Sequence, residues 1–171
     1  MTVWFALVFF VYLQTKAVMA TAIMSGIYLV MVAFSGFWLG SLVDHYKKKL
    51  VMVLSSIVSL CMYIMGFLIY LFIDPTVFTQ LVSSWLWIFI LVLLLGVIAS
   101  NIRTIALPTL VTILVPEKIR DKANGMVGTI SGVSFLVVSV ISGFLVAAGG
   151  MYYVFLLSIG LLLIALIHLI W

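Results

Sequence analysis

The chain has 171 residues, of which 67% are hydrophobic and only 7% are charged, and its formal net charge is +4. Soluble domains carry about 25% charged residues, so this composition excludes a water-soluble globular protein. The apolar stretches are long enough to cross a bilayer, which takes roughly 20 residues. We therefore expect an all-α, polytopic transmembrane helix bundle.

Six hydrophobic segments follow one another in a single predicted domain over residues 1–171. The first is too short to cross the hydrocarbon and counts as a partial span, whereas the other five are full spans. Charged loops at 44–49 and 116–122 separate some of them, and polar breaks at 14–16, 74–84 and 149–150 separate the others. The predicted spans are 2–13 (partial), 17–43, 50–73, 85–115, 123–148 and 151–171.

The loop cations predict the orientation in the membrane. Loops 44–49 and 116–122 hold six lysines and arginines, and the alternate loops hold only Lys16. Cytoplasmic loops carry the excess of Lys and Arg, so both charged loops are expected on the cytoplasmic side of the cell membrane. Lys47, Lys48 and Lys49 are also expected to contact anionic lipid, at about 1 kcal/mol per cation near the surface.

Two charged patches resemble the major facilitator superfamily of transporters. The stretch Gly40-Ser-Leu-Val-Asp44-His-Tyr-Lys47-Lys48-Lys49 is similar to the family's loop between spans 2 and 3, which reads Gly-x-Leu-Ala-Asp-Arg-x-Gly-Arg-Arg. Residues 114–136 are similar to the loop between spans 4 and 5 of drug-exporter-like members, where Val-Pro-Glu precedes a basic loop and Ala-Asn opens span 5.

The resemblance implies an N-terminal six-helix half of a twelve-span fold, truncated in its first helix. A fragment, a misassigned start, a decayed gene and one of two separately encoded halves all fit this expectation. Asp44 would then act in a cytoplasmic gate, pairing with basic groups and a helix N-terminus of the opposite half. Gly40, Lys47, Lys48 and Lys49 belong to the same gate segment.

Arg103 is the most informative residue inside a span. A cation at the centre of a membrane helix costs about 2.5–3.5 kcal/mol on insertion scales, so something must offset it. Arg103 either faces a cavity on a substrate or proton pathway, or extends its side chain to the cytoplasmic interface. Asn101 is a second pathway candidate, but a two-residue step turns a helix by about 200°, so the two do not share a face. Gln14 and the serines of span 123–148 are further polar candidates.

Small residues four positions apart predict close helix packing in span 123–148. Gly128 and Gly132 form one such pair, and Ser139 and Gly143 form another. Pro108 is expected to kink or end the regular part of the fourth apolar segment, 85–115.

The expected function is secondary transport, most simply export of a small amphipathic molecule by alternating access. The alternative is a non-transporting membrane remnant or a half-subunit that binds a partner. Expected partners are the lipid bilayer, a small-molecule substrate and a second six-span half, but not nucleic acid. No nucleotide, zinc or nucleophile motif occurs, so no enzyme activity, catalytic residue, cofactor or metal is expected.

Overall fold

A computed structural model describes all 171 residues, and every regular element in it is helical. Helices α2 to α6 are long and apolar enough to cross a membrane, whereas α1 has only 14 residues. This confirms the predicted all-α membrane bundle. The elements are α1 Thr2–Thr15, α2 Val18–His45, α3 Lys48–Phe72, the 3-10 helix η1 Pro75–Thr79, α4 Ser84–Leu114, α5 Glu117–Gly149 and α6 Met151–Ile170.

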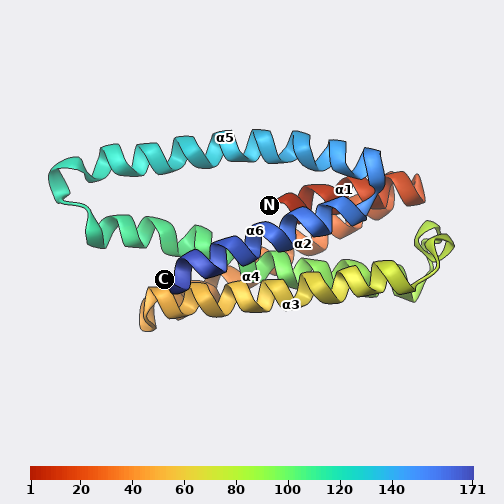
Figure 1. The fold of residues 1–171 in the computed structure, drawn as a ribbon, viewed down its shortest axis with the longest axis horizontal. Coiled ribbons are helices and arrows are strands. Elements are labelled where there is room, and N and C mark those ends of the chain that lie inside the picture. The colour runs from red at the N-terminus through yellow and green to blue at the C-terminus, as the bar shows by residue number, and fades with distance from the viewer.

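The helices run along a common long axis, so the turns gather at two ends of the bundle (Figure 1). One end holds the α2–α3 and α4–α5 turns and the C-terminus, and we call it the basic end. The opposite end holds the α1–α2 turn, η1 and the α5–α6 turn, and we call it the η1 end. Lys49 Nζ donates a hydrogen bond to the Ile170 carbonyl oxygen (3.0 Å), which ties the start of α3 to the end of α6.

The helix pairings reveal an internal repeat of three helices. Contacts join α1 to α5, α3 to α4 and α3 to α6. In a repeat of three helices, α1 corresponds to α4, α2 to α5 and α3 to α6. The counterparts of the three pairs are then α4 with α2, α6 with α1 and α6 with α3, and all of these also pack together. Because α1 runs towards the η1 end and α4 runs away from it, the two three-helix units have opposite directions (Figure 1).

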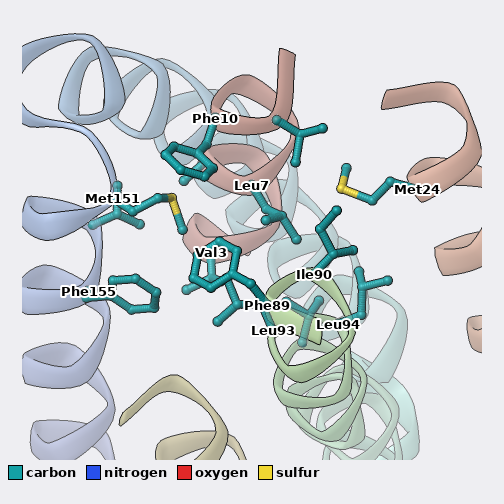
Figure 2. Close-up of a cluster of buried hydrophobic side chains, with 14 of the residues drawn as sticks. Val3, Leu7, Phe10, Met24, Phe89, Ile90, Leu93, Leu94, Met151 and Phe155 are labelled. Atoms are coloured by element: carbon teal, nitrogen blue, oxygen red, sulfur yellow. The ribbon is translucent and has the colours of Figure 1, made fainter. Parts of the chain in front are cut away.

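The hydrophobic core is concentrated in the half of the bundle nearer the η1 end. Figure 2 shows side chains of α1, α4 and α6 meeting there, among them Leu7, Phe89 and Phe155, each fully buried. A separate cluster nearer the basic end contains only Val43, Val51, Ile102 and Ala106 as buried members. The buried side chains of this second cluster come from α2, α3 and α4.

Helices α3 and α4 are in close contact at a glycine of α4. The Ser59 hydroxyl of α3 donates to the Gly96 carbonyl oxygen of α4 (2.9 Å). A Cβ at Gly96 would lie 2.7 Å from Tyr63 Cε1, so only glycine allows this contact as it stands. Small residues in a membrane helix allow such an approach between backbones, and the interhelical hydrogen bond adds to it.

Two predicted boundaries differ from the structure. Predicted loops 44–49 and 116–122 are mostly helical: only Tyr46 and Lys47 separate α2 from α3, and α5 begins at Glu117 rather than 123. Lysine, arginine and glutamate are good helix formers, so the charge marks where the apolar span ends and not where the helix ends. Similarly, Pro108 does not end the fourth span, because α4 continues through it to Leu114.

Candidate functional site

The α2–α3 turn at the basic end carries the residues predicted to form a gate. Asp44 and Lys47 are exposed, and the Asp44 side chain accepts no hydrogen bond within the chain. Lys48 Nζ donates instead to the Asp44 backbone carbonyl (3.2 Å). A Cβ at Gly40 would meet no atom within 4 Å. The carboxylate of Asp44 is therefore available to groups outside this chain, and its gate role stays a prediction.

Arg103 lies in α4 and borders two cavities. The first has a volume of about 260 Å³ between α1, α3, α4 and α6, and Tyr63 and Ser158 line it with Arg103. Ser158 is 6% exposed and its hydroxyl has no hydrogen-bond partner. Arg103 thus lines this cavity together with two hydroxyl side chains, those of Tyr63 and Ser158, and its role on a pathway stays a prediction.

The second cavity lies between α4 and α5 and measures about 510 Å³. Its lining includes Arg103, Asn124, Gly128, Ser131 and Ser134. Two of the predicted polar candidates, Ser131 and Ser134, are thus brought to the same cavity as Arg103. Arg103 stands eleven residues before the end of α4, a distance of roughly 17 Å along the helix.

Asn101 belongs to a different part of the bundle. It lines a cavity of about 270 Å³ with Ser35 and Gly36 of α2, and Arg103 is not among the lining residues. This agrees with the rotation of about 200° around the helix axis between positions 101 and 103 of α4. Gln14 lies near the end of α1, at the η1 end, so it does not reach the Arg103 cavities either.

The predicted packing residues of α5 fall into two groups. A Cβ at Gly143 would lie 3.3 Å from the Phe9 ring of α1, so this glycine is at a helix contact. A Cβ at Gly128 or Gly132 would meet nothing within 4 Å, and Ser139 is half-buried. Gly128 lines the cavity between α4 and α5, so no helix of this chain packs closely on it, and the packing role of Gly128, Gly132 and Ser139 stays a prediction.

An aromatic cluster closes the η1 end, and sequence reasoning did not single it out. Phe78 of η1 is 1% exposed, and its ring centroid lies 5.8 Å from that of Phe10 and 5.2 Å from that of Phe89. Phe89 also contacts Phe155 of α6. The signal was a phenylalanine inside a polar loop, which an exposed loop has no reason to carry.

Asp74 caps the start of η1, the short helix that carries Phe78 of the aromatic cluster. Its Oδ1 accepts hydrogen bonds from the Thr76 backbone N–H (2.9 Å) and hydroxyl (2.7 Å). These bonds favour the charged form, so they hold the pKa of the Asp74 carboxyl below its ordinary value. The loop therefore starts with a capped turn and ends in the core.

Comparison with known proteins gives one result that agrees with this architecture. The family model described as Major Facilitator Superfamily matches residues 1–171. Neither the curated proteins nor the solved structures gave a match. The oppositely directed three-helix units are the 3+3 inverted repeat found within each six-span half of such transporters. The chain is a multi-pass membrane protein with transmembrane helices, and it belongs to the Major Facilitator Superfamily of transporters.

Proposed function

We propose that this chain forms one half of a secondary transporter that exports a small amphipathic molecule by alternating access, as drug-exporter-like members of the family do. The observation that carries the proposal is Arg103, a cation inside the bundle that borders two cavities. The substrate would bind near the membrane midplane, against this half and a second six-span half.

Arg103 supports a transport pathway because the chain offers it no acidic partner. All four acids lie in or next to turns at the ends of the bundle: Asp44, Asp74, Glu117 and Asp121. An unpaired guanidinium in hydrocarbon is costly, and such residues face water-filled cavities or ligands. Water, a proton-exchanging group or a polar part of the substrate would then offset the cost at the Arg103 cavities.

The aromatic cluster supports a closed η1 end. Phe78 of η1 is 1% exposed and packs on the buried rings of Phe10 and Phe89. In alternating access, this form would be closed towards the η1 end, and a second form would open there.

Charge supports a cytoplasmic basic end in the cell membrane. Six of the eight lysines and arginines lie at that end: Lys47, Lys48, Lys49, Lys118, Arg120 and Lys122. The positive-inside bias then places the α2–α3 and α4–α5 turns in the cytoplasm. Asp44, with its carboxylate free within the chain, would hold the cytoplasmic gate closed through groups of the second half.

A second candidate is a half-subunit that binds a partner without transporting, and the exposure of α5 favours it. Residues 128–137 of α5 are exposed in this chain, Gly128 and Gly132 among them. Two bundles could approach closely along this segment. The proposed transporter also needs such a surface, so only an activity measurement separates the two.

Efflux of a fluorescent amphipathic dye from cells tests the transport proposal. The chain is produced alone and together with a six-span second half. Transport by either form supports the proposal. The rate of efflux should fall at least tenfold in Arg103→Gln. The control Lys122→Gln removes a cation outside the cavities and should transport normally. Asp44→Asn should also reduce efflux with membrane insertion intact. Absence of efflux in both forms, with the two halves shown to assemble, would favour the partner-binding alternative.

A further inference from the structure

An apolar groove lies between α2, α3 and α4, apart from the Arg103 cavities. Its volume is about 490 Å³, and twelve of its thirteen lining residues are hydrophobic. The exception is Ser55, whose hydroxyl donates to the Met52 carbonyl oxygen (3.0 Å) and therefore does not need a hydrogen-bond acceptor on a ligand. The groove can therefore hold only hydrocarbon along its length.

The groove follows one face of α3 from the basic end into the bundle. Its α3 lining residues recur at successive turns: Leu50 and Val51, Leu54, Val58 and Met62. Lys47 to Met62 is a path of fifteen residues, or roughly 22 Å. One leaflet of hydrocarbon is about half of the roughly 30 Å core. The groove thus starts at the headgroup level and reaches the middle of the bilayer, which is the path of one acyl chain.

The mouth of the groove is polar and positive. Tyr46 lines it and Lys47 follows directly, one turn before Leu50 on α3. The ammonium groups of Lys48 and Lys49 donate hydrogen bonds to backbone carbonyls, whereas that of Lys47 donates no hydrogen bond within the chain.

The one nearby acid does not share this mouth. Asp44 is two residues from both Leu42 and Tyr46, which line the groove on α2. A two-residue step within α2 turns the helix by about 200°, so the Asp44 carboxylate belongs to the face of α2 opposite Leu42, whereas Tyr46 follows the end of the helix. An anion at the mouth would meet Lys47 without meeting that carboxylate.

We propose that this groove is a specific site for an anionic phospholipid, with one acyl chain between α2, α3 and α4 and the phosphate at Tyr46 and Lys47. The charge of Lys47 complements the headgroup, and the length of the groove fits a single chain. The first backbone N–H groups of α3 face the same level and favour a phosphate there. The site does not depend on the transport activity proposed above.

Native mass spectrometry of the purified chain in detergent tests the site. Phosphatidylglycerol and phosphatidylcholine with identical acyl chains are added in equal amounts, and the retained lipid is counted. We expect one phosphatidylglycerol to be retained in preference, and Lys47→Gln to reduce that preference about fivefold, as one cation near the surface predicts.

Two further variants separate the headgroup from the chain. Leu54→Trp fills the groove and should abolish retention of the single lipid although Lys47 is present. Lys122→Gln removes a cation from the other turn of the basic end and should leave the preference unchanged. Circular dichroism checks that each variant is folded. Equal retention of the two lipids, or the same loss in Lys122→Gln as in Lys47→Gln, would overturn the proposal, as would normal retention in a folded Leu54→Trp.

Discussion

The contact between α3 and α4 makes a sharp prediction for Gly96→Ala. The added Cβ would lie 2.7 Å from Tyr63 Cε1, 2.9 Å from Tyr63 Cδ1 and 3.0 Å from Met62 Cβ. Carbon atoms in contact prefer about 3.5 Å or more, so the ring must move by roughly 0.8 Å. Tyr63 is buried, at 4% exposure, so its ring can move only by entering the cavity that it lines beside Arg103. Overpacking of this kind costs about 1–3 kcal/mol.

The measurement is unfolding of the purified chain in mixed micelles, followed by circular dichroism as SDS increases. Gly96→Ala should unfold at a lower SDS fraction than the unchanged chain. Gly128→Ala is the matched control, because a Cβ there meets nothing within 4 Å. Alanine is also the better helix former, so the control should be neutral or more stable.

A double-mutant cycle identifies the cause of the loss. Tyr63→Leu removes the ring atoms that the new Cβ would meet, so Gly96→Ala should cost clearly less in the Tyr63→Leu background. Residues in contact show interaction energies of about 0.5–3 kcal/mol in such cycles. If Gly96→Ala is as stable as the unchanged chain, or if the two changes are simply additive, the close approach of α3 and α4 is not as described.

Three further predictions concern the turns and the same helix pair. Gly150 has φ 63° and ψ −151°, a conformation that is essentially restricted to glycine, so Gly150→Ala should lower stability by about 1–3 kcal/mol in the same SDS titration. Ser59→Ala removes an interhelical hydrogen bond and should cost about 0.6 kcal/mol, against a maximum of about 1.7 in membrane proteins; a larger loss would mean that the variant also disturbs packing. The pKa of the Asp74 carboxyl is lowered, so its bonds to Thr76 stabilise η1 above the ordinary pKa of about 3.9 and are lost as pH falls through the lowered value. The protection factor of the Thr76 amide against exchange should fall over that range and should already be low at neutral pH in Asp74→Ala; an unchanged protection factor in that variant would contradict the capped turn.

Hydrophobic run length was sufficient to predict the bundle, because a helix must satisfy its own backbone in hydrocarbon. The ends of the helices were less predictable. Lys48 and Glu117 begin helices, although their charge suggested loops, because both residue types favour the helical conformation. Membrane boundaries and helix boundaries are set by different properties of the same residues.

Only part of the candidate site could be predicted from the sequence. Arg103 stands out as a charge within a span, but Tyr63 and Ser158 are ordinary residues of apolar helices, and only the packing of α3 and α6 on α4 brings them to its cavity. The small residues of α3 were missed as well. Ser55 and Ser59 are four apart and buried, which is the spacing that drew attention to α5.

Water access to position 103 tests the central claim most directly. In a Cys61→Ser background, which removes the exposed native thiol, Arg103→Cys and Leu68→Cys are each exposed to a membrane-impermeant thiol reagent in oriented vesicles. Leu68 is a 46% exposed residue of α3 on the outside of the bundle and serves as the lipid-facing control. We expect Arg103→Cys to react from the side that carries the basic end and Leu68→Cys to stay unlabelled. Failure of Arg103→Cys to react from either side would contradict a cavity on a transport pathway.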